Sequence, residues 1–212
     1  MSPRHHPSDP VLADYASGSL DQGSALVVGT HVSLCPACRE AARAFEHVGG
    51  VLLEDLAPTP LKSGARGTIL EKLDLAVAVE GRPASIGADA DLPIPLAEQD
   101  LGPWRWIGRG VYWRSVGSDW EDGTRVFMLK AAPGTPLPHH RHEGREWTCI
   151  LQGAFRHDLG RYGAGDFDEA DEHDEHRPFV ETGEPCICLV AMQGQIELQG
   201  WFGRLLQPFV RI

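Results

Sequence analysis

The sequence has little positive charge and no long apolar segment. Its 212 residues include 19 Lys and Arg against 30 Asp and Glu, which gives a formal net charge of −11. Neutralising nucleic-acid phosphates requires a basic face, so this charge argues against a nucleic-acid partner and favours a basic protein partner. No apolar run approaches the roughly 20 residues of a membrane helix, and residues 1–10 lack the apolar core of a signal peptide. We therefore expect a soluble cytoplasmic protein without a membrane or direct nucleic-acid partner.

Cysteine is also scarce, with five residues at positions 35, 38, 149, 186 and 188. An odd, clustered set argues against a disulfide framework and favours metal binding in a reducing compartment. The hydrophobic and charged fractions, 42% and 23%, are those of ordinary globular proteins and exclude wholesale disorder.

Residues 1–78 have the spacing of short amphipathic helices. A first helix is expected from Asp9 to just before Gly18, a residue typical of helix ends. Further helices are predicted over residues 21–32, 35–52 and 68–75. This part of the chain is therefore predicted to be an all-α helical bundle, small enough to benefit from a bound metal.

Residues 79–103 are rich in proline, glycine and acidic residues, a composition that predicts a linker. All six tryptophans follow it, together with alternating runs that predict strands over residues 111–116, 124–131, 146–151 and 186–192. Short strands separated by glycine and proline indicate an all-β jelly-roll barrel over residues 104–212. The sequence thus predicts two domains, with the boundary near residue 100.

A metal-binding pattern occurs in the helical part, where His31, Cys35 and Cys38 form H-x3-C-x2-C. Zinc binds thiolate and imidazole in a closed tetrahedral site, and this spacing brings the three side chains to one side of a helix junction. The alternative is a pair of buried or redox-active cysteines, but the strand–helix context of a redox motif is absent. His5 and His6 are both candidates for the fourth ligand.

A second pattern, G-x5-H-x-H-x3-E-x6-G, begins at Gly134 and ends at Gly153. Its three candidate ligands are His140, His142 and Glu146. This is the first motif of the cupin barrels, in which two histidines two residues apart on a strand face the barrel interior. In the second motif Gly165-Asp166 matches the expected turn, and the spacing favours His176 over His173 as fourth ligand. Such a set suits Zn, Fe, Mn or Ni, the alternative being a barrel that has lost its metal.

Other candidate residues have simpler interpretations. The segment 166–175 holds seven acids and is expected to be a solvated loop, with attraction of a basic partner or a metal as the alternative. Cys186 and Cys188 face the same way on a predicted strand and are interpreted as buried cysteines, with oxidant sensing as the alternative. His47 and His157 are expected at the surface.

Beyond the two metal-binding patterns, segments along the whole chain are typical of one protein family. They are His6 with Ser8-Asp9, the segments 15–20 and 24–28, Thr30-His31, the pair Cys35 and Cys38, and the segments 152–156, 163–166, 175–176, 186–189 and 206–209. In this order they resemble the ChrR-type zinc-dependent anti-sigma factors, which combine a helical zinc domain with a cupin domain.

The resemblance implies the metal ligands and the partner. His6, His31, Cys35 and Cys38 would bind zinc, which selects His6 over His5; His140, His142, Glu146 and His176 would bind a second metal ion, again zinc. The helical domain would bind between the two domains of one extracytoplasmic-function sigma factor, in a 1:1 complex that blocks its polymerase-binding surfaces. The cupin domain would control release of the sigma factor in response to oxidative stress, by singlet oxygen or organic hydroperoxides.

The alternative function is a cupin metalloenzyme of the dioxygenase type, which would need an open metal position beside an apolar substrate pocket. The N-terminal zinc site would have no role in such an enzyme. The sequence therefore favours a transcriptional regulator with no catalytic residues.

Overall fold

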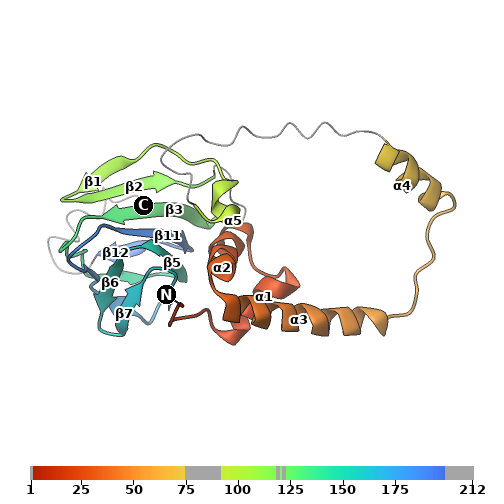
Figure 1. Cartoon of the computed structure of the whole chain (residues 1–212), viewed down its shortest axis with the longest axis horizontal. Coiled ribbons are helices and arrows are strands. Elements are labelled where there is room, and N and C mark those ends of the chain that lie inside the picture. The colour runs from red at the N-terminus through yellow and green to blue at the C-terminus, as the bar shows by residue number, and fades with distance from the viewer. Residues whose placement is uncertain (1, 75–91, 118–119, 121–122, 199–212) are drawn as a thin grey trace.

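The computed structural model describes residues 2–74, 92–117, 120 and 123–198, with residues 74, 142 and 196–198 described by their backbone alone. Most of the predicted linker and the segment 206–209 lie outside these residues. Figure 1 shows a β-rich body with helix α2 (Gln22–Leu34) against it, helix α3 (Pro36–Glu54) running away from it, and helix α4 (Ala65–Asp74) standing apart.

The first four helices match the sequence predictions closely, whereas the fifth lies within the predicted linker. The helices are α1 (Asp9–Ser17), α2 (Gln22–Leu34), α3 (Pro36–Glu54), α4 (Ala65–Asp74) and the short α5 (Ile94–Ala97). Helix α1 ends at Gly18, which has φ 72°, the left-handed conformation that favours glycine. The Asp21 side chain caps α2 by accepting the backbone N–H of Ser24 at 3.0 Å. Cys35 lies at the junction of α2 and α3, just before Pro36.

The remainder is a set of antiparallel strands. They are β1 (Arg105–Gly108), β2 (Val111–Ser115), β3 (Arg125–Ala131), β4 (His140–His142), β5 (Glu146–Gln152), β6 (Ala154–His157), β7 (Gly160–Gly163), β8 (Phe167–Ala170), β9 (Glu175–His176), β10 (Phe179–Val180), β11 (Cys186–Met192) and β12 (Ile196–Leu198). They form a six-stranded sheet in the order β1-β2-β3-β11-β5-β8 and two three-stranded sheets, β10-β6-β7 and β12-β4-β9. Within the described residues these sheets do not close into a single hydrogen-bonded barrel.

The large sheet has two apolar faces because its side chains alternate. On one face Val126, Trp147 and Ala191 pack against the N-terminal helices. On the other face Phe127 and Val190 belong to a second cluster that surrounds a pocket. The sequence predicted these strands from alternating runs, but burial on both faces allows apolar side chains at consecutive positions, as in β11.

The N-terminal helices share one core with the large sheet. Helix α2 packs on β3, β5 and β11, and its Val27 and Val28 are fully buried. Helix α5 packs on α2, with Leu96 fully buried. Leu101 pairs with Val116 beside β2. Along the chain the helices therefore precede the strands, but in the folded molecule helix α2 and the large sheet share one core. None of the described helices has both the length and the apolar character needed to cross a membrane.

Candidate metal sites and pocket

The structure brings together the four N-terminal residues named from the sequence, His6, His31, Cys35 and Cys38. One donor atom from each lies within 4.8 Å of all the others. Cys38 Sγ is 3.3 Å from His31 Nε2 and 3.3 Å from His6 Nδ1, and Cys35 Sγ is 3.5 Å from His6 Nδ1. Sulfur and nitrogen ligands of a tetrahedral zinc ion are about 3.6 Å apart, given the usual zinc–ligand lengths. The donor types and their spacing therefore fit zinc.

His31 is held in place by the β-rich part of the molecule. Its side chain is fully buried, and its Nδ1 lies 2.9 Å from the carbonyl oxygen of Gly165. A carbonyl only accepts, so Nδ1 carries the proton and Nε2 is left to face Cys38. The ring of Phe167 in β8 contacts His31 edge-on, with centroids 5.4 Å apart. The turn before β8 thus orients an N-terminal candidate ligand.

Burial keeps His31 and Cys38 neutral when no metal is bound. It lowers the pKa of His31 to about 4 and raises the pKa of Cys38 to about 12. At neutral pH the imidazole is ready to bind a metal, whereas the Cys38 thiol must lose its proton first. Metal affinity at this site is therefore expected to rise with pH.

The two neighbouring histidines point in different directions. His6 faces the cysteines, whereas His5 stacks on Tyr162 of β7 with ring centroids 4.3 Å apart. Both belong to the N-terminal arm, residues 2–8, which precedes α1. The metal-ligand chemistry read from the sequence did not decide whether His5 or His6 is the fourth ligand. The structure brings only His6 to the metal-binding group.

Asp166 attaches the N-terminal arm to the β-rich part. Its carboxylate accepts the backbone N–H of Arg4, of His5 at 3.1 Å and of Gly163 at 2.8 Å. Burial alone would raise the pKa of Asp166, but these hydrogen bonds outweigh it and lower the pKa. The sequence prediction of a solvated acidic loop is therefore wrong for Asp166 and Asp168, which are buried at 4% and 6% exposure.

We predict that Asp166→Ala releases the N-terminal arm. Loss of a buried charged acceptor should lower the free energy of arm opening by about 1–3 kcal/mol, measured as faster amide exchange of residues 4–8. Because the Asp166 pKa is lowered, its contribution is present above the unfolded pKa and is lost as pH falls through the lowered value. Asp158→Ala, in the exposed β6–β7 turn, is the control. Unchanged exchange in Asp166→Ala contradicts the prediction.

Three of the predicted cupin ligands, His140, Glu146 and His176, line one pocket. His140 Nδ1 lies 2.8 Å from the carbonyl oxygen of Pro138, so its Nε2 faces the pocket, 3.0 Å from His176 Nε2. Glu146 lines the same pocket and accepts the Thr148 hydroxyl at 3.2 Å. Burial raises the pKa of Glu146, which His140 opposes. Two imidazoles and a carboxylate directed together form a donor set that fits a divalent transition metal.

The other candidates are placed as follows. His142 lies in β4, opposite Ile196 of β12, and its side chain is outside the described residues. His176 is buried in the pocket, whereas the His173 side chain is 84% exposed. His47 is exposed, as predicted. The set of His140, His142, Glu146 and His176 remains a prediction.

The sequence analysis did not identify two further residues of this region, His157 and Asp168. His157 was expected at the surface, but its side chain is fully buried, with Nε2 3.1 Å from Asp168 Oδ2. Donor atoms of His157, Asp168 and His176 lie within 4.8 Å of one another. The signal was the alternation in β6, where Phe155 and His157 share a face.

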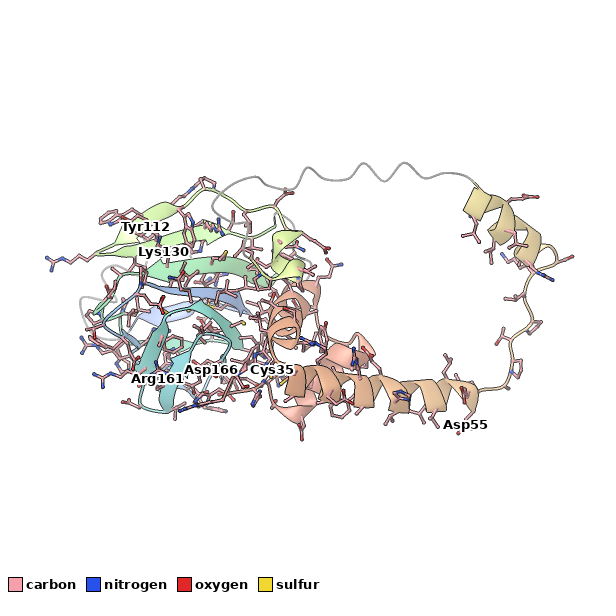
Figure 2. The ribbon with its side chains drawn as sticks, viewed as in Figure 1. Cys35, Asp55, Tyr112, Lys130, Arg161 and Asp166 are labelled. Atoms are coloured by element: carbon pink, nitrogen blue, oxygen red, sulfur yellow. The ribbon has the colours of Figure 1, made fainter. Side chains whose placement is uncertain are left out.

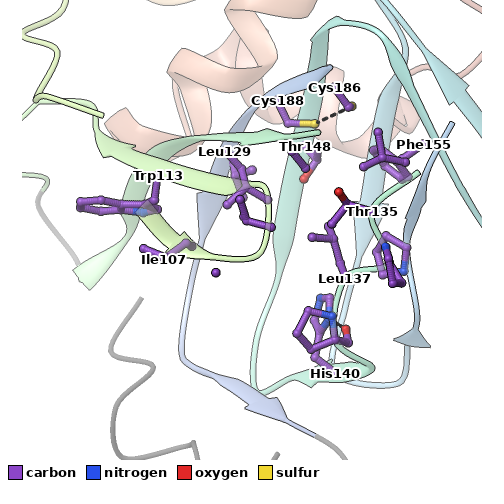
Figure 3. Close-up of a pocket in the computed structure, with 18 of the residues that line it drawn as sticks. Ile107, Trp113, Leu129, Thr135, Leu137, His140, Thr148, Phe155, Cys186 and Cys188 are labelled. Atoms are coloured by element: carbon purple, nitrogen blue, oxygen red, sulfur yellow. Dashed lines mark hydrogen bonds between the residues drawn. The ribbon is translucent and has the colours of Figure 1, made fainter. Parts of the chain in front are cut away.

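The pocket has a volume of about 670 Å³, which is ample for a small organic molecule. Figure 3 shows His140 at one end and Cys186 with Cys188 at the other, with Trp113 and Leu129 along one side. The two buried sulfurs are 3.6 Å apart. The hydrogen bond that the Cys188 thiol makes to Cys186, together with burial, raises the pKa of Cys188, so this thiol is protonated at neutral pH. Cys188 therefore lacks the thiolate character of a reactive cysteine.

The entire chain is similar in sequence to a known protein. Residues 96–196 match the family described as the ChrR cupin-like domain. The anti-sigma-E factor ChrR of Cereibacter sphaeroides is 40% identical over 219 aligned positions, which cover all of both chains. A chain in the crystal structure of Rhodobacter sphaeroides SigE in complex with the anti-sigma ChrR superimposes with a TM-score of 0.75 at 36% identity. That match covers 91% of this chain and 100% of the other.

The chain belongs to the ChrR family of anti-sigma factors. This membership confirms the resemblance inferred from the sequence, and it identifies a regulator rather than an enzyme of the dioxygenase type. The cupin-like region and the helical N-terminal region occur in the order that was predicted.

In this ChrR-family chain an extensive apolar surface is exposed on the helices farthest from the sheets. The side chains at the end of α3, between the helices and on α4 are 50–79% exposed: Val48, Val51, Leu52, Leu53, Leu56, Leu61, Ile69, Leu70 and Leu73. Figure 2 shows Asp55, just after α3, far from the sheets. Exposed apolar side chains gathered in one part of the chain in this way are typical of a site for a protein partner.

Proposed function

We propose that this chain is an anti-sigma factor that binds one extracytoplasmic-function sigma factor and releases it under oxidative stress. The observation that carries the proposal is the exposed apolar surface on α3 and α4. This surface belongs to a chain that is 40% identical, over its full length, to an anti-sigma factor. Because these side chains have no place in the core, a partner that covers them would gain most of its affinity there.

Charge supports the same partner. Sigma factors must present basic surface to DNA, and a chain with a net charge of −11 attracts such surface. Charge attraction accelerates association, while apolar burial supplies affinity. We infer a 1:1 complex in which the helices cover the surfaces that the sigma factor uses to bind RNA polymerase.

We further propose that residues 1–78 form a zinc-binding helical domain, residues 79–103 a linker and residues 104–212 a cupin domain. Zinc at His6, His31, Cys35 and Cys38 would crosslink the arm, α2 and α3. The ion supplies folding free energy and no reaction chemistry. By holding α3 against α2 it would fix the direction in which the exposed apolar surface points.

A second metal, which we propose to be zinc, would bind His140, His142, Glu146 and His176 in the cupin domain. Strand β8 offers a direct route between this site and the N-terminal one. Phe167 in β8 contacts His31 of the N-terminal group, and the next residue, Asp168, lines the cupin pocket. A change in the pocket that moves β8 would therefore move a ligand of the N-terminal zinc.

Strand β8 also holds the arm that carries His6. Phe167 donates its backbone N–H to the carbonyl oxygen of His5 at 3.1 Å. Glu169 accepts the backbone N–H of Ser8 at 3.2 Å and the Ser8 hydroxyl at 3.3 Å. The cupin domain thus has the contacts needed to control the conformation of the helical domain.

The proposal is tested with the sigma factor encoded beside this gene and a reporter that depends on it. The reporter should be silent when the full chain is present and active after exposure to singlet oxygen or an organic hydroperoxide. Equal reporter activity with and without the chain would contradict the proposal.

A further inference from the structure

One buried carboxylate in the pocket is absent from the ligand set predicted from the sequence. Asp168 lies in the middle of β8, is 6% exposed and lines the pocket. Its neighbours Phe167 and Glu169 contact the N-terminal region, so strand alternation directs Asp168 to the opposite side. A buried carboxylate needs hydrogen-bond donors or a cation to offset the loss of solvation.

A donor from another strand orients this carboxylate. His157 Nε2 lies 3.1 Å from Asp168 Oδ2, and burial together with the nearby Asp168 charge raises the pKa of Tyr162 in β7. The backbone N–H of Leu159 donates to His157 Nδ1 at 3.2 Å, which fixes the ring proton on Nε2. Both nitrogens of His157 are therefore engaged, and the ring positions Asp168 rather than binding a metal itself. Ligating carboxylates are commonly held by such outer hydrogen bonds.

The oxygen that His157 orients lies beside the cupin imidazoles. The ligand atoms of His157, Asp168 and His176 lie within 4.8 Å of one another. His176 Nε2 is in turn 3.0 Å from His140 Nε2. The carboxylate is thus close enough to share a metal ion with His176, which in turn lies beside His140.

We propose that Asp168 is an additional ligand of the cupin metal, with His157 as its positioning residue. The inference rests on the cupin metal site proposed above and adds a ligand outside the cupin motifs. Together with Glu146, Asp168 would provide two negative charges that balance a divalent cation within the pocket. A second carboxylate also adds an oxygen ligand, and oxygen ligands suit hard metal ions. Such a site would therefore favour Mn²⁺ and Fe²⁺ more than a site with one carboxylate.

The test compares metal affinity in full-length variants by competition with a chelator. Asp168→Asn keeps the size of the side chain and an acceptor for His157 but removes the charge. We expect it to weaken Zn²⁺ binding at the cupin site about 100-fold, and His157→Phe to weaken it about 10-fold. Glu172→Gln removes the same charge from the exposed turn that follows β8 and should leave affinity at the cupin site unchanged. Thiolate absorption after substitution with Co²⁺ identifies the N-terminal ion separately.

The outcomes separate this inference from the proposed function. If the parent chain binds two ions and Asp168→Asn binds the second with parental affinity, Asp168 is not a ligand. If the parent chain binds only the N-terminal ion, the cupin metal site itself is wrong. Should Asp168→Asn fail to fold, as judged by circular dichroism, Asp168→Ser is tested by the same criterion.

Discussion

Replacing Cys35 and Cys38 by alanine should abolish binding of the sigma factor. Both thiols are almost completely buried, at 1% and 3% exposure, and belong to the candidate zinc group that joins the arm, α2 and α3. A structural zinc ion contributes about 10–16 kcal/mol to the folding of a small domain. Its loss should unfold most of residues 1–75 and weaken the complex by at least about 1,000-fold.

Circular dichroism, metal content and sigma binding should be measured on the same double variant. Cys149→Ala is the matched control, because Cys149 is also buried but lies in β5 and is not one of the four grouped metal-binding residues. The control should keep its zinc and its partner. Nanomolar sigma binding by the double variant would refute a structural role for the N-terminal metal.

An acidic residue on the exposed apolar surface should disrupt the complex without unfolding the chain. Leu53 in α3 and Leu73 in α4 are 69% and 74% exposed, so Leu53→Asp and Leu73→Asp should change stability by less than about 0.5 kcal/mol. If both side chains become buried against the partner, each substitution should cost at least about 2 kcal/mol of binding, or roughly 30-fold.

The control for these variants is Leu159→Asp. Leu159 is 64% exposed, close to the values of the two test residues, but it lies in the β6–β7 turn of the β-rich part. Calorimetry or biolayer interferometry with the purified sigma factor measures all three. If Leu159→Asp lost binding while both helix variants bound like the parent chain, the sigma factor would bind the cupin domain and not α3 and α4.

The sequence predicted those features that depend on short-range spacing. The intervals between His31, Cys35 and Cys38 are set by one helix junction, so the three residues could be grouped before the structure was known. The glycine that ends the cupin motif is explained in the same way. Gly153 has φ 71°, and a Cβ there would lie 2.5 Å from the Pro185 carbonyl oxygen.

Features that depend on long-range packing were not predicted. The buried position of His157 beside Asp168 depends on the pairing of distant strands, which local alternation does not fix. An acidic run such as 166–175 suggests a solvated loop because charge is usually exposed, and only the docked N-terminal arm accounts for the burial of Asp166. The core shared by α2 and the large sheet likewise has no local signature.

The central claim is tested most directly by elemental analysis and gel filtration of the chain, alone and co-expressed with its adjacent sigma factor. The account predicts two zinc ions per chain and a stable 1:1 complex that survives the column. One zinc together with one iron, manganese or nickel, and no complex with the sigma factor, would contradict it.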